Sequence, residues 1–164
     1  ATPRVHRLLL HQGTIRLAAF QPARHRPHFL LQPLLVAQRA AIVRVLGAHA
    51  AVQKVHYPGL KDHPGHAIAV KQQSGFGAMI SFELQDTEEV KAFLAKLRYF
   101  SLAESLGGVE SLVAHPASMT HAAMEEPARR AAGLVDGLLR LSIGIEAHDD
   151  LKADLAAGLA GLSA

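Results

Sequence analysis

The sequence predicts one domain of the mixed α/β class, with helices and strands alternating along the chain. Its 164 residues suit a single hydrophobic core, and 49% of them are apolar, which is ordinary for a globular protein. From about residue 34 onward, stretches with helical periodicity alternate with stretches that suit strands. The chain contains no cysteine, which excludes a disulfide scaffold and any thiolate metal or redox site. The absence of cysteine also fits a cytoplasmic protein, which we expect. No apolar run reaches the ~18 residues that a membrane span requires, so no membrane partner is expected.

Charge is distributed unevenly along the chain. Residues 1–61 contain no Asp or Glu, whereas all 14 acidic residues lie from Asp62 onward. The first 33 residues are rich in arginine, histidine and proline, and no helical or strand period persists through them. We therefore divide the chain into an atypical basic segment, 1–37, and a folded domain, 38–164.

Four interpretations of segment 1–37 remain open. A nucleic-acid-binding arm would fit the charge, but aromatic residues for stacking are nearly absent, so we do not expect nucleic acid as a partner. A transit peptide would normally contain more serine and an initiating Met. The histidine spacings fit no compact metal motif. We favour a disordered segment or a stretch read out of frame, because the composition changes so abruptly.

Five helices and four strands are expected after residue 33. Apolar periodicity and capping signals place the helices at 34–46, 62–73, 86–97, 125–132 and 149–159. Strand patterns lie at 52–57, 78–84, 99–102 and 138–144. Asp62 is the expected cap of the second helix and Asp86 or Thr87 that of the third. Pro22, Pro27 and Pro33 are expected to break any long helix across residues 21–35.

A glycine pair, Gly107-Gly108, marks a sharp bend within residues 101–116. Paired glycines allow a positive φ angle or a close approach to a ligand. Glu104 and Ser105 stand just before the bend, where a hydroxyl and free backbone N–H groups suit a carboxylate or phosphate. From these residues alone, a plain turn between two core segments is the simpler interpretation.

Arg140 is the most informative charged residue, because it lies in an expected strand made otherwise of Leu, Ile, Ser and Gly. Alternation places two sets of side chains on opposite faces: Leu139, Leu141 and Ile143 on one, and Leu138, Arg140 and Ser142 on the other. An unpaired buried arginine is costly, and its planar fork suits bidentate binding of a carboxylate. A structural salt bridge or an exposed strand face is the alternative.

Two histidine pairs are weaker candidates. His63 and His66 are three residues apart on an expected helix, a spacing that metal sites use, but no acidic partner is near and we expect surface side chains. His115 and His121 flank a loop and are interpreted as polar loop residues rather than acid–base groups. No Ser/His/Asp set and no phosphate-binding glycine motif can be assembled.

Five motifs occur in a fixed order: KVHYPGL at 54–60, SGFG at 74–77, the stretch 102–116 with AESLGG, SMTH at 118–121 and RLSIGIE at 140–146. From about Gln38 to the C-terminus, this order resembles the C-terminal domain of the pyridoxal-phosphate enzymes of cysteine and methionine metabolism. The resemblance is strongest to the cystathionine gamma-synthase and gamma-lyase branch.

The resemblance implies a fold and an activity. The fold is the small α+β domain of a fold-type-I pyridoxal-phosphate transferase, a mainly antiparallel sheet covered by helices. The intact family forms homotetramers that act with pyridoxal phosphate on a homoserine-derived amino acid or cystathionine. In the gamma-synthase, cysteine replaces the γ-substituent of an O-acylhomoserine; a carbon–sulfur lyase is the alternative. Ser105 and Arg140 resemble the pair that holds the substrate α-carboxylate, and Glu104 resembles a position associated with substrate choice.

The sequence also departs from the family. The family's large domain carries the Schiff-base lysine, and none of Lys54, Lys61 and Lys71 lies in that lysine's sequence context. We therefore expect this chain alone neither to bind pyridoxal phosphate well nor to turn over substrate. A truncated or frameshifted enzyme fragment is the interpretation we favour. A non-catalytic remnant and a basic-arm binding module remain alternatives.

Overall fold

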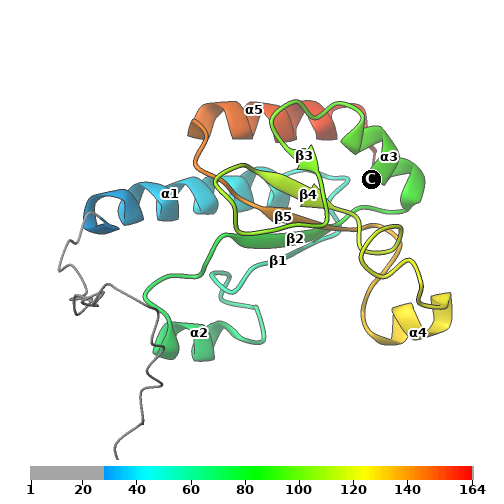
Figure 1. The fold of residues 1–164 in the computed structure, drawn as a ribbon, viewed down its shortest axis with the longest axis horizontal. Helices are drawn as coiled ribbons and strands as arrows, with labels where there is room; N and C mark the ends of the chain where they lie inside the picture. The colour runs from blue at the N-terminus through cyan, green and yellow to red at the C-terminus, as the bar shows by residue number, and fades with distance from the viewer. Residues whose placement is uncertain (1–27, 164) are drawn as a thin grey trace, which may run out of the picture.

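The computed structural model describes residues 28–163, so the interpretations of residues 1–27 lie outside the described residues. Figure 1 shows a sheet with helices around it. The helices are α1 (His28–Gly47), α2 (His66–Gln72), α3 (Thr87–Leu94), α4 (Glu126–Ala131) and α5 (His148–Leu159). The strands are β1 (Lys54–His56), β2 (Met79–Glu83), β3 (Ser101–Leu102), β4 (Leu112–Ala114) and β5 (Leu138–Ser142). The expected mixed α/β class is confirmed.

The five strands form one sheet in the order β1-β2-β5-β4-β3. Its neighbours pair antiparallel, except that β3 and β4 run parallel. The expectation of a mainly antiparallel sheet is therefore confirmed. The pairing places Arg140 of β5 between Ser81 of β2 and Ala114 of β4.

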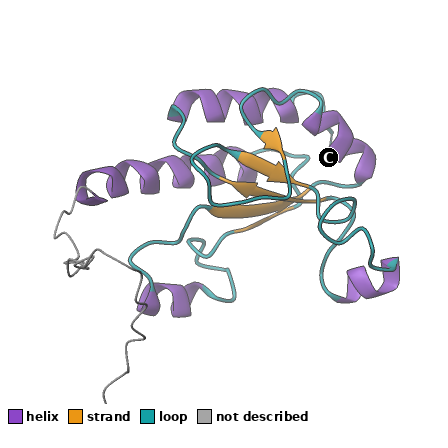
Figure 2. Ribbon diagram, in the orientation of Figure 1, coloured by secondary structure: helices purple, strands orange, loops and turns teal. Residues whose placement is uncertain are grey.

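The hydrophobic core lies on one face of this sheet, under α1, α3 and α5 (Figures 1 and 2). On β5, Leu139 and Leu141 are fully buried and pair with Phe82 and Ile80 of β2, which are buried as well. The covering helices contribute Leu46, Phe93 and Leu155, among others. Because side chains alternate along a strand, Arg140 projects from the opposite face.

Two predicted helix starts are wrong. The first helix begins at His28 rather than near Leu34, and it continues through Pro33. Pro33 is the sixth residue of this helix, where proline costs a backbone hydrogen bond and a ring clash but does not end the element. The second helix begins at His66 after Gly65, and no side chain caps it, so Asp62 is not its cap. Turns from Leu60 to His66 occupy the expected first turn instead.

The predicted cap of α3 is confirmed, whereas one strand was missed. Asp86 accepts hydrogen bonds from the backbone N–H groups of Glu88 and Glu89. The missed strand is β4, three buried residues between β3 and β5 in the sheet. A run of three apolar residues next to a glycine bend has too little periodicity to identify a strand. The proposed domain boundary at residues 37/38 stays a prediction, and α1 crosses it.

Gly158 is where α5 crosses Phe93 of α3, and it leads to a prediction about stability. A Cβ atom at Gly158 would lie 2.7 Å from Phe93 Cε2. Because Phe93 is fully buried, it cannot move aside cheaply. Gly158→Ala should lower the free energy of unfolding by about 1–3 kcal/mol, as overpacking does. Urea denaturation measures it.

Gly47→Ala is the matched control, because no atom lies within 4 Å of its added Cβ. This change at the end of α1 should be neutral or stabilise the chain by up to about 1 kcal/mol. Equal unfolding midpoints for the two variants would contradict the predicted crowding at Gly158.

Candidate functional site

Arg140 lies on the central strand β5 and, because side chains alternate along a strand, projects from the face opposite the core. It is half-buried, and its Nη2 donates to the carbonyl oxygens of Glu104 at 2.9 Å and Ser105 at 3.2 Å. Its Nε is buried and has no hydrogen-bond partner in the described residues. Within those residues, no acidic side chain forms an ion pair with Arg140. The alternative of a structural salt bridge is therefore not supported in this part of the chain.

The segment between β3 and β4, residues 103–111, contacts Arg140 and the Ser142 end of β5; we call it the clamp loop. Gly107 has a φ of 76°, a conformation that L side chains rarely adopt, so the predicted glycine bend is confirmed. The Gly107 N–H donates to Ser142 Oγ at 2.8 Å, and the Ile145 N–H donates to the Val109 carbonyl at 2.9 Å. These bonds place the clamp loop beside the residue two positions after Arg140.

The structure brings Glu104 and Ser105 to Arg140, but through backbone carbonyls. Both residues are exposed. In the described residues, neither the Ser105 hydroxyl nor the Glu104 carboxylate has a hydrogen-bond partner, so both stay available to a ligand. A positive guanidinium held only by neutral carbonyls favours an anion nearby, and a carboxylate matches its fork.

Ser142, Ser111 and Glu146 are polar residues of this region that sequence reasoning did not single out. Ser142 accepts the Gly107 N–H, and the Glu146 carboxylate accepts both the N–H and the hydroxyl of Ser111. The sequence pattern could have identified Ser142, because alternation places it on the same strand face as Arg140. Ser111 and Glu146 lie outside regular elements, where periodicity gives none.

The histidine candidates are structural in the described part of the chain. His66 Nδ1 bonds the Pro58 carbonyl at 2.8 Å, and its ring stacks on Phe76. His115 is buried, with Nδ1 2.7 Å from Ser118 Oγ and Nε2 2.8 Å from the Asp136 carbonyl oxygen. Both ring nitrogens of His115 are therefore occupied. His121 bonds its neighbour Thr120.

Residues 38–163 contain no group of three or more His, Asp or Glu side chains that could hold a metal ion. No helix among these residues is long and apolar enough to cross a membrane. Neither finding adds a candidate to the region around Arg140.

Asp136 ties helix α4 to the loop before β5 and leads to a prediction about pH. The hydrogen bond from Arg129, supported by the charge of Arg130, holds the pKa of Asp136 below its ordinary value of 3.8. A carboxyl whose pKa is lowered on folding stabilises the fold above its unfolded pKa, and this contribution is lost as the pH falls through the folded value. We expect amide protection in α4 to hold from pH 7 to 5 and to fall first below about pH 4.

Hydrogen exchange followed by NMR measures this protection, and Asp136→Asn is the control. That variant lacks the titrating group, so its α4 protection should be low already at pH 7 and should change little in acid. If Asp136→Asn protects α4 at pH 7 as well as the unchanged chain does, or if protection in the unchanged chain rises as the pH falls from 5 to 3, the assigned pKa direction is wrong.

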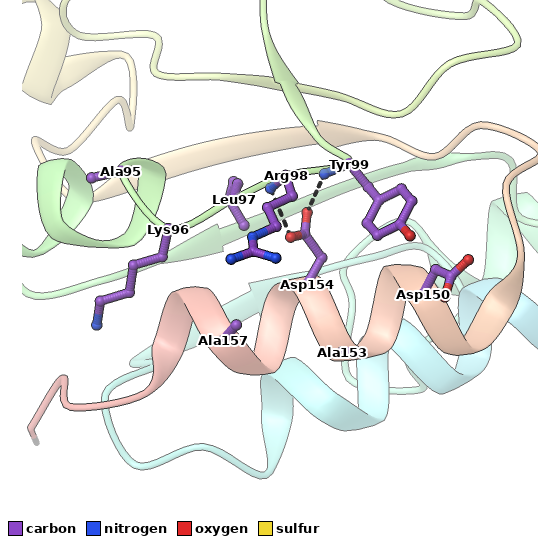
Figure 3. A pocket seen from close by; sticks show the side chains of 9 residues that line it. All are labelled: Ala95, Lys96, Leu97, Arg98, Tyr99, Asp150, Ala153, Asp154 and Ala157. Atoms are coloured by element: carbon purple, nitrogen blue, oxygen red, sulfur yellow. Dashed lines mark hydrogen bonds between the residues drawn. The ribbon is translucent and has the colours of Figure 1, made fainter.

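A hollow of about 540 Å³ lies away from Arg140, between α5 and the segment that leads from α3 to β3 (Figure 3). Asp154 is its buried acid, but that carboxylate already accepts the N–H groups of Arg98, Tyr99 and Phe100. The acceptor oxygens of this carboxylate are therefore already used by the backbone. Arg140 is the better candidate for ligand binding.

A family model described as Cys/Met metabolism PLP-dependent enzyme matches residues 36–160. Among similar proteins, a cystathionine beta-lyase of Lactococcus lactis subsp. cremoris (strain MG1363) is 56% identical over 73% of this chain and 31% of its own length. The cystathionine gamma-synthase of Escherichia coli (strain K12) is 52% identical over 79% of this chain and 34% of its own length.

A solved structure is similar as well. The cystathionine gamma-synthase of Xanthomonas oryzae pv. oryzae, in complex with aminoacrylate and cysteine, has a TM-score of 0.73 and 62% sequence identity. The match covers 77% of this chain and 33% of that one. The chain thus spans about a third of the length of the relatives it matches.

Proposed function

The chain belongs to the Cys/Met metabolism PLP-dependent enzyme family, and from that premise we propose that it supplies the part of such an enzyme that holds the substrate α-carboxylate. The reaction we favour is that of a cystathionine gamma-synthase, in which cysteine replaces the γ-substituent of an O-acylhomoserine. Carbon–sulfur lyase activity is the alternative, because lyases stand among the relatives at similar identity.

One observation carries this proposal: Arg140 is half-buried on the sheet face opposite the core and has no acidic partner in the described residues. An arginine in that setting gains charge-assisted hydrogen bonds when a carboxylate arrives. The clamp loop adds the exposed Ser105 hydroxyl on the same side. Glu104, also exposed, offers a negative charge to a substrate ammonium group and is our candidate for substrate choice.

The described residues do not fit the cofactor itself. A Schiff-base lysine must be desolvated and close to the reacting carbon. Lys54, Lys61 and Lys71 are exposed, and Lys91, Lys96 and Lys152 are bonded to Glu88, the Ala160 carbonyl and Asp149. We therefore assign no cofactor contact to these residues and confine the proposal to binding and orienting the substrate carboxylate.

A chimera tests the proposal in a complete enzyme. Residues 38–164 would replace the matching segment of the E. coli cystathionine gamma-synthase. Because half of the replaced residues are identical, the chimera should fold and bind pyridoxal phosphate through the retained part. We expect it to form cystathionine from cysteine and an O-acylhomoserine, measured by chromatography of the amino acids.

The same assay separates the two activities. Elimination products from cystathionine, without the replacement product, would favour the lyase. A folded chimera that holds pyridoxal phosphate and yet processes neither cystathionine nor an O-acylhomoserine would contradict the proposed function.

A further inference from the structure

The clamp loop buries little apolar surface. Leu106 and Val109 are 54% and 66% exposed, and Glu104 and Ser105 are exposed as well. A loop of this kind gains little from packing, so its hydrogen bonds decide where it lies. Its two contacts with Arg140 depend on those bonds, because Arg140 reaches only the loop's backbone carbonyls.

Glu146 provides the anchor at the end of the loop. Its Oε1 lies 2.5 Å from the Ser111 nitrogen, and its Oε2 lies 2.7 Å from Ser111 Oγ. In the described residues Glu146 forms no ion pair, so its carboxylate serves the backbone and hydroxyl of one serine. Its own carbonyl accepts a hydrogen bond from Gln38 Nε2 at 3.1 Å, which ties it to α1.

The directions of these hydrogen bonds follow from chemistry. A carboxylate only accepts, so Ser111 must donate both its N–H and its hydroxyl proton to Glu146. The Ser111 oxygen then keeps its lone pairs for the Gly144 N–H, 2.9 Å away. Ser111 is fully buried, so no water replaces these partners. A backbone hydrogen bond from the Ile145 N–H to the Val109 carbonyl also joins the loop to the segment that follows β5.

We propose that Glu146 is a positioning residue: acting through Ser111, it sets where Glu104 and Ser105 lie relative to Arg140. It touches no substrate in this scheme. The ligand part of the proposal rests on the proposed function, whereas the loop geometry stands without it.

Glu146→Gln changes one atom in this arrangement. The Ser111 N–H and hydroxyl bond different oxygens of Glu146, Oε1 and Oε2. The amide keeps one acceptor oxygen and puts an NH₂ donor in place of the other, so in this geometry one Ser111 donor faces a donor. That Ser111 donor then lies buried without an acceptor, which favours a displaced loop. We expect affinity for an amino-acid probe, L-cystathionine, to fall about tenfold, within the range of coupling seen for directly bonded residues.

The full chain, labelled with ¹⁵N, allows three readouts by NMR. These are the exchange protection of the Gly107 and Ile145 amides, the Arg140 Nε–H resonance, and the dissociation constant for L-cystathionine. In Glu146→Gln, protection at both amides should drop and the Arg140 resonance should shift. Protection in β2 should not change, whereas a general loss of stability would lower it throughout the sheet.

Matched variants test whether Glu146 acts on the loop through Ser111. Glu110→Gln alters an exposed glutamate at the end of the same loop and should leave all three readouts unchanged. Ser111→Ala should reproduce the Glu146→Gln effects. The double variant should be no worse than either single change, within about twofold, because both break one connection. If Glu146→Gln does not fold, Ser111→Ala carries the test.

The outcomes separate this proposal from the proposed function. Normal loop protection and an unmoved Arg140 resonance in folded Glu146→Gln and Ser111→Ala would overturn the positioning role. If the unchanged chain shows no affinity for L-cystathionine, the binding function is weakened, but loop effects confined to these variants still support Glu146 as the residue that positions the loop.

Discussion

Arg140→Met in the chimera should lower kcat/KM by on the order of 100-fold, the largest functional effect that we expect from any single change. Methionine keeps much of the arginine volume but removes the charge and every donor. Charge-assisted hydrogen bonds contribute about 1.5–3 kcal/mol each, so losing a bidentate pair accounts for a factor of this size. Steady-state kinetics with an O-acylhomoserine measure it.

Two further arginine variants test whether charge or geometry matters. Arg140→Lys keeps the charge but loses the planar fork, so its kcat/KM should lie between those of Arg140→Met and the unchanged chimera. Arg44→Met removes an exposed arginine from α1 and should change kcat/KM less than twofold. An Arg140→Met enzyme that is folded, cofactor-loaded and as active as Arg44→Met would remove Arg140 from the site.

The fold could be predicted where the sequence pattern and the tertiary environment agree. Strand β5 is an example: alternation places Leu139 and Leu141 on one face, and both are fully buried against the core. Helix α3 is another, because Asp86 offers both a cap and the start of an amphipathic segment. The start of α2 could not be predicted, since Asp62 is a good cap whose helical turn is replaced by turns that end at Gly65.

The sequence names residues for the candidate site, but it does not give their contacts. The resemblance to a family points to Arg140, Ser105 and Glu104, and the structure brings all three together. The contacts run through main-chain carbonyls, however, which any residue at positions 104 and 105 would provide. Because every residue type has a backbone carbonyl, hydrogen bonds to that group cannot be inferred from the sequence. The same is true of the Gly107 N–H, whose acceptor lies 35 residues further along the chain.

Asp154 is a buried residue that the sequence pattern could have revealed. It follows Leu151 by three positions and precedes Leu155 by one, so it shares their side of α5, and the structure buries all three. An acid on the core side of a helix needs partners. It finds them in the N–H groups of Arg98, Tyr99 and Phe100, at 2.7, 2.9 and 3.1 Å (Figure 3 shows the first two).

Asp154→Ala should therefore lower the free energy of unfolding by about 3 kcal/mol, the largest stability effect that we expect. Arg98 and Tyr99 are exposed, so water can reach their N–H groups after the change. Phe100 is 4% exposed, and its N–H would lose the only acceptor that it has in the described residues. Urea denaturation measures the loss, and exchange of the Phe100 amide locates it.

Asp150→Ala is the matched control, because this aspartate lies one turn earlier on α5 and lines the same hollow. It is half-buried and its carboxylate accepts no hydrogen bond in the described residues, so removing that carboxylate should change the free energy of unfolding by no more than about 0.5 kcal/mol. Phe100 directly precedes β3, and β3 leads into the clamp loop. If the two variants have the same unfolding midpoint, the Asp154 carboxylate does not fix the backbone before β3. The position of the clamp loop then depends only on the hydrogen bonds of Glu146 to Ser111 at the other end of the loop.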